Sequence, residues 1–231
     1  MSDLIAQFKN RLIISCQAPA DSPLHAPEMI AAIAQACVNQ GGVGVRIDSP
    51  DHIRAVRAKL PQIPIIGLWK RTFPESDVYI TPRLEDALAV VKAGADIVAI
   101  DATARPRPNG ESLADLIAGI HQKTGKLVMA DLDTYDNAQR AAQAGADILG
   151  TTLYGYTGET QHLTPPGFEL LEKLTQDFEL PVICEGGIHT PEMLQKAFQL
   201  GADSVVVGTA ITGVDLLAQK FCQASQAIAQ A

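Results

Sequence analysis

The chain has 231 residues, of which 47% are hydrophobic, so it is long and apolar enough to form one large α/β domain. Its net charge of −8 and its aromatic content of 5% argue against nucleic-acid binding through a basic surface or an aromatic stacking platform. An anionic ligand would need local donors, because the overall electrostatic field repels it.

Targeting and metal-binding patterns are missing from the sequence. The first residues, MSDLIAQFKNRLII, lack the charged and then apolar order of a secretory signal, and no stretch approaches the length of a membrane span. The four cysteines show no C-x-x-C spacing, which is typical of reduced thiols in a cytoplasmic protein. The five histidines form no ligand pair, so we expect no metal site. We predict a cytoplasmic protein without a membrane or nucleic-acid partner.

Short apolar runs rich in valine and isoleucine alternate with amphipathic patterns along the chain. The predicted strands span residues 12–18, 43–48, 64–69, 97–101, 127–132, 148–154, 181–185 and 204–209. The segments between them, such as PEMIAAIAQACVNQGG and PEMLQKAFQLGA, predict helices. One phrase recurs at three joints, in KAGADIVAIDAT, QAGADILGTTLY and QLGADSVVVGTA, where a glycine ends a helix just before the next strand.

Eight strand–helix units favour a closed parallel barrel, the (β/α)8 or TIM fold, over an open doubly wound sheet. No G-x-G-x-x-G follows the first strand, which also disfavours a dinucleotide-binding sheet. No linker-like segment interrupts the alternation. We therefore expect a single (β/α)8 barrel domain over residues 1–231.

Six predicted strands carry a polar residue near the carboxyl end, where barrel enzymes place their chemistry. These residues are Gln17, Arg46, Lys70, Asp101, Asp131 and Glu185. A strand end that meets solvent explains any one of them equally well, but six on one rim favour a binding site. Ile66, Leu68 and Lys70 share one face of their strand, so Lys70 points at the barrel mouth if that face lines the interior.

Glycine-containing loops follow the last two predicted strands, in EGGIHTPEM and VGTAITG. Glycine lets the backbone approach a ligand closely, and N–H groups at the start of a helix attract an anion. Barrels of the phosphate-binding type hold a phosphate at these two loops. The glycines could serve tight turns alone, but the pair favours a phosphate site at Gly186, Gly187, Gly208 and Thr209.

Several longer motifs are more specific than the barrel pattern. They are SCQA, GVRI, IIGLWKR, ITP, DIVAIDAT with RPRP, MADLDT, GTTL with GYT, EGGIHTPE and VVVGTAIT. Over residues 10–212 the chain resembles the bacterial N-acetylmannosamine-6-phosphate 2-epimerases. The resemblance implies an isomerase that interconverts the 6-phosphates of N-acetylmannosamine and N-acetylglucosamine in sialic-acid catabolism, without a nucleotide or metal cofactor.

The same resemblance implies roles for single residues. Lys70 matches the family's catalytic lysine and Glu185 its catalytic acid, while Gln17, Arg46 and Asp131 match positions that hold the sugar. The glycines of EGG and VGT match the phosphate loops. A lysine that acts as a base must lose its proton, so burial at the rim would have to lower its pKa from about 10.4.

The chain departs from the family pattern at two positions. Tyr154 stands where members usually have serine, and Gly213 stands where they usually have an arginine suited to pair with the phosphate. We expect an arginine restored at position 213 to bind phosphate if the pocket has room for it.

Other candidate residues have a structural explanation. Cys184 should face the helices, on the side of its strand opposite Glu185, as a small core residue. Arg105 and Arg107, in RPRP, could reach over the pocket, but loop arginines are mostly solvated charges.

Two other functions remain open from the sequence. Lys70 could form a Schiff base, as in a lyase or synthase of the phosphate-binding barrels. A barrel that only binds a phosphosugar is the other alternative, although a pure binder needs neither Lys70 nor Glu185. The segment DLLAQKFCQASQAIAQA carries an apolar stripe that could pack on a second copy of the chain, which suggests a homodimer.

Overall fold

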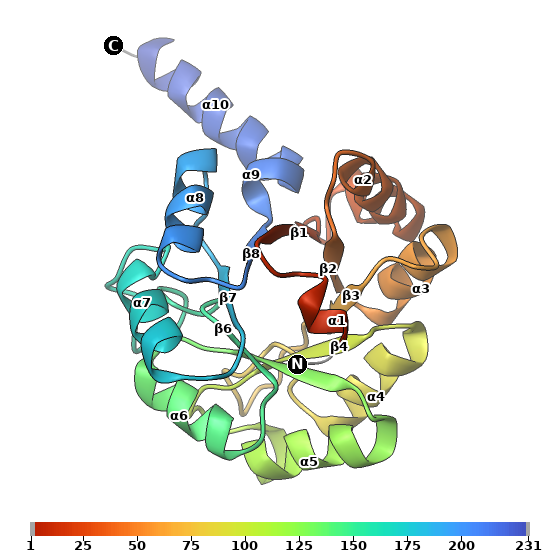
Figure 1. Cartoon of the computed structure of the whole chain (residues 1–231). Coiled ribbons are helices and arrows are strands. Elements are labelled where there is room, and N and C mark those ends of the chain that lie inside the picture. The colour runs from red at the N-terminus through yellow and green to blue at the C-terminus, as the bar shows by residue number, and fades with distance from the viewer. Residues whose placement is uncertain (1–2, 230–231) are drawn as a thin grey trace.

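Eight parallel strands, each hydrogen-bonded to the next and β8 to β1, form a closed barrel in the computed structural model, which describes residues 3–229 (Figure 1). The strands are β1 Arg11–Cys16, β2 Gly44–Asp48, β3 Ile65–Leu68, β4 Ile97–Asp101, β5 Leu127–Asp131, β6 Ile148–Gly150, β7 Val182–Glu185 and β8 Ser204–Val207. The predicted (β/α)8 fold is confirmed. Of the range 1–231 expected for the domain, residues 1–2 and 230–231 lie outside the described part.

Helices surround the barrel, and each strand is followed by at least one of them (Figure 1). They are α1 Asp3–Ala6, η1 Pro23–His25, α2 Pro27–Asn39, α3 Pro50–Lys59, α4 Leu84–Ala93, η2 Pro108–Gly110, α5 Leu113–Thr124, α6 Tyr135–Gln143, α7 Phe168–Asp177, α8 Pro191–Gln199, α9 Thr209–Thr212 and α10 Val214–Ala229. The glycine of each repeated joint, at positions 94, 145 and 201, has a positive φ, as a helix-ending glycine requires.

Two apolar clusters divide the side chains of the strands. Ile66 and Leu68 belong to the cluster inside the barrel, so the face that leads to Lys70 does line the interior. Ile5 and Phe8 join this cluster from the amino-terminal end of the strands. Cys184 belongs to the cluster between strands and helices, as predicted.

The sixth strand is shorter than the predicted 148–154. It ends at Gly150, and the chain then turns, with the N–H of Tyr154 bonded to the carbonyl of Thr151 at 3.1 Å. The threonines and the tyrosine that follow have high β propensity, but tertiary contacts override that preference. The eighth strand similarly ends at Val207, and Thr209 starts α9.

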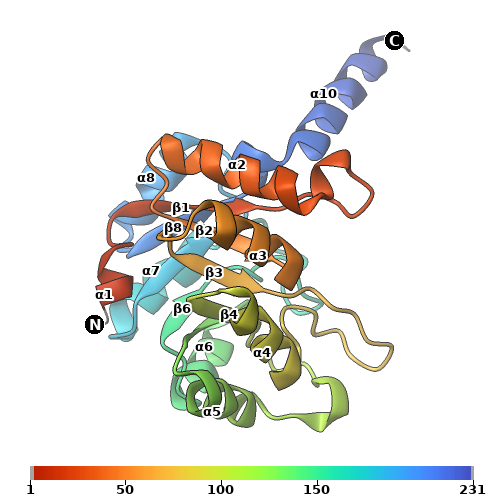
Figure 2. The same cartoon turned by 90° about the vertical axis from the view of Figure 1, so that its right-hand side faces the viewer.

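A hairpin-like excursion follows β3 and stands at the carboxyl end of the barrel. Lys70 pairs with Ile80 in an antiparallel bridge, and Phe73 pairs with Ser76 near its tip. Figure 2 shows this excursion projecting from the end of β3, on the side opposite α1.

The last helix, α10, leaves the barrel and points away from it in both views (Figures 1 and 2). Val214, Leu216 and Phe221 on this helix are exposed. Within residues 3–229, no helix combines the length and the apolar character that a membrane crossing requires.

Candidate active site

A cavity opens at the carboxyl ends of the strands and brings most of the predicted site together. It is lined by Gln17, Arg46, Lys70, Glu185, Gly186, Gly187, Gly208 and Thr209, among other residues. Asp101 and Asp131, which the strand-end pattern also indicated, are not part of this lining, and both side chains are completely buried. These residues come from both ends of the chain, and the closed barrel places them around one mouth.

Arg46 lies at the centre of the site and pairs with both acidic residues. Its Nη2 atom is 2.6 Å from Oδ2 of Asp131, and its Nη1 atom is 3.2 Å from Oδ1 of Asp131 and 3.1 Å from Oε2 of Glu185. Burial would lower the pKa of this guanidinium, but the carboxylates of Asp131 and Glu185 raise it on balance. Arg46 therefore stays charged with almost no exposed surface.

Arg46 stands near the carboxyl end of β2, as predicted, two residues before the strand ends at Asp48. Its long side chain covers the remaining distance to the mouth. Asp131 binds Arg46 from the side away from the cavity. A direct contact between Asp131 and a sugar stays a prediction, and the observed bonds favour a role in which Asp131 holds Arg46 in position.

Glu185 ends β7, and 12% of its side chain is exposed to the cavity. The pKa of this carboxyl group is raised to about 7, chiefly by burial and also by Asp131, which together outweigh the lowering effects of Arg46, Thr152 and Lys70. Near neutral pH, Glu185 thus exchanges a proton easily, as a general acid or base must.

Lys70 follows β3 by two residues and reaches the cavity from the base of the hairpin. Its backbone N–H donates to Oδ1 of Asp48 at 2.9 Å, and its ammonium donates to the amide oxygen of Gln17. The amide nitrogen of Gln17 donates to Oγ of Ser15 at 2.9 Å. Lys70 is exposed in this structure, so the burial expected at the rim is not provided by protein atoms alone.

The ring of Trp69, the residue before Lys70, is covered by the side chain of another cation. The guanidinium of Arg71 lies 4.7 Å from the centre of the Trp69 ring. Lys70 itself lines the cavity and so points at the barrel mouth, as predicted.

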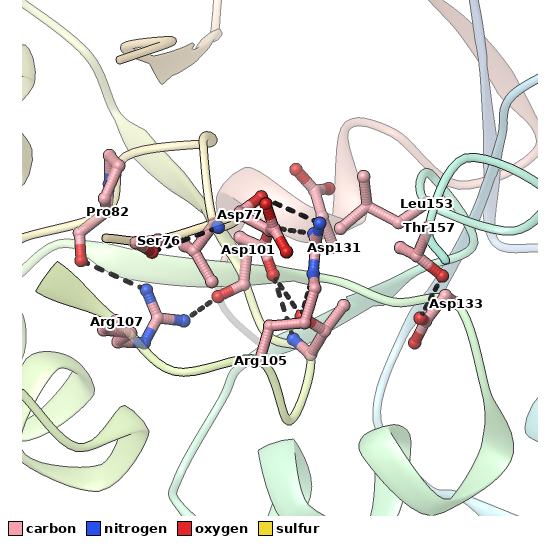
Figure 3. A network of polar contacts seen from close by, with 12 residues as sticks. Ser76, Asp77, Pro82, Asp101, Arg105, Arg107, Asp131, Asp133, Leu153 and Thr157 are labelled. Atoms are coloured by element: carbon pink, nitrogen blue, oxygen red, sulfur yellow. Dashed lines mark hydrogen bonds and ion pairs between the residues drawn. The ribbon is translucent and has the colours of Figure 1, made fainter. Parts of the chain in front are cut away.

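A second network, on the other side of the mouth, ties the loops together (Figure 3). Oδ2 of the buried Asp101 accepts from Nη2 of Arg105 at 2.6 Å, and Nη1 of Arg105 donates to the carbonyl of Asp77 at 2.8 Å. Arg107 is also buried and donates to the carbonyls of Asp101 and Pro82. Both arginines thus link the loop after β4 to the hairpin after β3. The prediction of ordinary solvated charges is wrong for them, and neither lines the cavity of Lys70 and Glu185.

The cavity also contains residues that the sequence reasoning missed. They are Ser15, Tyr79, Ile80, Thr152, Tyr156, Ile188, His189 and Val206. Ser15 could have been found by the two-residue alternation that leads to Gln17. Thr152 and Tyr156 stand in the motifs GTTL and GYT, which carried the family resemblance without a role for single residues. Tyr79 gave no signal, because the hairpin that places it was not predicted.

Comparison with known proteins agrees with this geometry. Residues 30–227 match the family described as "Putative N-acetylmannosamine-6-phosphate epimerase". The chain belongs to this family. A protein of Synechococcus elongatus described as a 2-epimerase of this kind is 58% identical over 224 residues, which cover 96% of this chain and 97% of that protein. A Clostridioides difficile relative with the same description is 43% identical over 221 residues, covering 96% and 98% of the two chains.

A solved structure supports the same assignment. The N-acetylmannosamine-6-phosphate 2-epimerase of Clostridium perfringens superimposes with a TM-score of 0.91 at 39% identity, over 96% of both chains. The protein is therefore an isomerase of the epimerase class, built on the barrel that this family shares.

Both departures from the family pattern have a place in the structure. The ring of Tyr154 lies against Gly167, where a Cβ atom would be 2.6 Å from the ring, so Tyr154 packs near the start of α7 and not in the cavity. At Gly213, a Cβ atom would lie 2.7 Å from the carbonyl oxygen of Thr209. Any side chain at position 213 therefore requires this backbone to shift, so the condition of available room for an arginine is not met here.

The raised pKa of Glu185 predicts how stability depends on pH. Between pH 4.5, the ordinary value, and about 7, the folded protein keeps a proton that the unfolded chain has released, so the free energy of unfolding falls as pH rises. Glu185→Gln removes this pH dependence. The free energy of unfolding of the variant, relative to that of the parent protein, should therefore increase by about 1–3 kcal/mol between pH 4.5 and 8. Urea unfolding at several pH values measures the difference.

The matched control for this prediction is Glu172→Gln, which changes an exposed carboxylate on α7. It should leave the difference from the parent constant over the same range. Parallel stability curves for Glu185→Gln and the parent would contradict the assigned pKa.

Proposed function

We propose that the protein interconverts N-acetylmannosamine 6-phosphate and N-acetylglucosamine 6-phosphate, in amino-sugar and sialic-acid catabolism, with residues 1–231 as one catalytic domain. The observation that carries the proposal is the pairing, in one cavity, of the Lys70 amine with the Glu185 carboxyl group, whose pKa is about 7. The names of the family relatives supply N-acetylmannosamine 6-phosphate and the position of epimerisation, and inversion at C2 of this sugar gives N-acetylglucosamine 6-phosphate. A cytoplasmic location stays a prediction from the sequence.

The reaction requires a proton to leave C2 and another to return on the opposite face. A sugar closed as a hemiacetal does not acidify C2, so the ring must open first to give an aldehyde at C1. Removal of the C2 proton then places negative charge on the C1 oxygen, which must be stabilised. The site therefore needs a base near C2 and a proton donor near O1.

Lys70 suits the role of the base at C2. Its flexible side chain reaches the cavity from the base of the hairpin, and the Gln17 amide accepts a hydrogen bond from its amino group without adding a negative charge. Once Lys70 has taken the C2 proton, its ammonium group can return a proton to the enolate. A bound substrate would cover the exposed amine and remove water from it, which favours the neutral form that a base needs.

Glu185 suits ring opening and proton movement near O1. A carboxyl group with a pKa of about 7 is present in both protonation states near neutral pH, so it can donate to the ring oxygen and take the O1 proton. Arg46 contacts the same carboxyl group and supplies a fixed positive charge close to where the enolate oxygen develops.

The phosphate group would lie against the loops after β7 and β8. Gly186, Gly187, Gly208 and Thr209 line the cavity there, and His189 lies beside them. The positive φ angles of Gly186 and Gly187, at +96° and +71°, give this loop a backbone shape that other residues rarely adopt. Backbone N–H groups can bind a phosphate without net positive charge, which suits a chain of charge −8.

The main test follows proton exchange at C2. In D₂O, N-acetylmannosamine 6-phosphate should gain deuterium at C2 as the second epimer appears in the proton NMR spectrum. Lys70→Ala should lower the rate by at least about 100-fold, because general bases contribute 10²–10⁴, and should leave the fold intact because Lys70 is exposed. A parent protein that shows neither exchange nor a second epimer would refute the function.

The same samples separate the alternatives. Borohydride reduction with substrate would give a stable lysine adduct only if Lys70 forms a Schiff base, which would favour a lyase or synthase. Binding of the phosphosugar without any exchange would favour a protein that only binds it. A Lys70→Ala variant within about tenfold of the parent rate would exclude the general-base role.

The phosphate site has its clearest test at Gly208. A Cβ atom there would lie 3.3 Å from Cβ of Ser15, so a β-branched side chain would crowd Ser15 in the wall of the cavity. Gly208→Val should raise KM for the 6-phosphate about tenfold or more with a smaller change in kcat, because it obstructs binding before it affects chemistry. Gly187 is less suitable, because its Cβ atom would lie 2.5 Å from Pro165 and disturb packing. A parent enzyme that accepts unphosphorylated N-acetylmannosamine equally well would overturn the phosphate assignment.

We further propose that the protein forms a homodimer through α10. This helix has 16 residues and leaves the barrel, and isolated helices of that length are marginal in water (Figures 1 and 2). Phe221 is 76% exposed, and Val214 and Leu216 are about half exposed. A second copy of the chain would cover these side chains in a symmetric contact.

The dimer is tested by placing a charge on this surface. Phe221→Glu should give monomers in sedimentation equilibrium at concentrations where the parent is dimeric, because a carboxylate cannot enter an apolar contact without a large desolvation cost. Gln219→Glu adds the same charge to a neighbouring exposed position and should leave the mass unchanged. A monomeric parent protein would contradict the proposal.

A further inference from the structure

We propose that Thr152 is a positioning residue whose hydroxyl group turns between Asp131 and Glu185 and so stabilises Glu185 both with and without its proton. The inference rests on the proposed function, in which Glu185 gives and takes a proton during each turnover. No role for Thr152 follows from the sequence motifs alone.

The geometry places one hydroxyl group between two carboxyl groups. Oγ1 of Thr152 is 2.7 Å from Oδ1 of Asp131 and 3.2 Å from Oε2 of Glu185. A hydroxyl group has a single hydrogen, so it can donate to only one of them at a time, but it can accept from the other. Thr152 is thus able to serve as donor and acceptor in the same place.

The backbone around Thr152 keeps this arrangement fixed. Thr151 donates from its hydroxyl group to the carbonyl of Glu185 at 2.9 Å and accepts from the N–H of Glu185 at 3.1 Å. The N–H of Leu153 donates to the carbonyl of Leu132 at 2.9 Å. The turn after β6 is therefore bound to β7 on one side and to the end of β5 on the other, and only the hydroxyl group of Thr152 has to rotate.

Two hydrogen-bond arrangements follow from these distances. When Oε2 of Glu185 carries a proton, it donates to Oγ1 of Thr152, and Thr152 donates to Asp131. When Glu185 has given its proton to a substrate oxygen, the Thr152 hydroxyl turns and donates to the Glu185 carboxylate. Asp131 keeps its two bonds from Arg46 in both cases. Thr152 keeps its own hydrogen, so one proton moves, from Glu185 to the substrate.

The other groups that face Glu185 cannot respond in this way. Arg46, from β2, only donates, and Asp131, from β5, only accepts while it is ionised. Lys70, after β3, acts on Glu185 through its positive charge, and burial, with help from Glu185, raises the pKa of Tyr156, from the loop after β6. In agreement with a donor role, the Thr152 hydroxyl lowers the pKa of Glu185, against the effect of burial.

The test compares two substitutions at one position. Thr152→Val keeps the shape and removes the hydroxyl group, whereas Thr152→Ser keeps the hydroxyl group. Carbon-13 NMR of protein labelled at the glutamate carboxyl carbon follows the titration of Glu185, and the signal lost in Glu185→Gln identifies it. The Glu185 pKa should rise in Thr152→Val, because the charge-assisted hydrogen bond that the carboxylate accepts is stronger than the one that the neutral acid donates, and it should stay near the parent value in Thr152→Ser.

Activity gives the second readout. Thr152→Val should lower kcat for epimerisation about 10- to 100-fold with little change in KM, and Thr152→Ser should restore most of it. Thr157→Val is the matched control, because Thr157 donates to the buried Asp133 at 2.7 Å (Figure 3) and not to Glu185. It removes the same kind of bond and should leave the Glu185 titration unmoved.

The outcomes separate this inference from the proposed function. A parent protein without epimerisation would refute the function, while the NMR titration would still test Thr152. An unchanged Glu185 titration in Thr152→Val would overturn the inference, and so would equal losses of activity in Thr152→Val and Thr152→Ser. If Thr152→Val does not fold, Thr152→Ala removes the same hydroxyl group with less crowding and must give the same upward shift.

Discussion

The buried ion pair of Arg46 is the interaction on which the site depends. A guanidinium with 2% of its surface exposed is costly to remove from water, and it is tolerated only because Asp131 and Glu185 both contact it. The same charge makes it possible for two carboxyl groups to stand near one another at the barrel mouth. Burial still raises the pKa of Glu185, so this carboxyl group is ready to exchange a proton, whereas Asp131 is held by two bonds from Arg46.

The base and the acid of the proposed reaction are held in different ways. Glu185 lies at the end of a strand and is bound through its backbone to Thr151, so its position is set by the barrel. Lys70 stands at the base of a hairpin and is exposed, so its environment changes when a ligand binds. Arg105 and Arg107 donate to backbone carbonyls in the returning half of that hairpin and just after it. These bonds limit how far the segment that contains Tyr79 can move. Substrate binding can thus alter the surroundings of Lys70 while the backbone of Glu185 stays fixed by Thr151.

Much of the fold and of the site could be predicted, because both follow from short-range patterns. The alternation of Ile66, Leu68 and Lys70 gave the direction of Lys70, and the closed barrel brought the strand ends together. The burial of Asp131 could not be predicted, since the sequence does not say which polar side chain lines the cavity and which lies beneath the lining. Thr152 was missed because its position depends on a turn where a strand was expected. The lack of room at Gly213 comes from the backbone of α9, which no pattern of side chains reveals.

Arg46, Asp131 and Glu185 come from β2, β5 and β7, so the central interaction crosses the barrel mouth and links strands that are not neighbours. A change in the barrel's shape at one strand would therefore be felt at the other two. Two carboxyl groups already neutralise the charge of Arg46, so it attracts a phosphate only weakly. The negative net charge of the chain does not attract a phosphate either. In the proposed function, the two ends of the substrate would be bound by different kinds of interaction. The sugar end would meet a set of nearly balanced charges that respond to proton transfer, and the phosphate end would meet backbone dipoles whose strength does not change during the reaction.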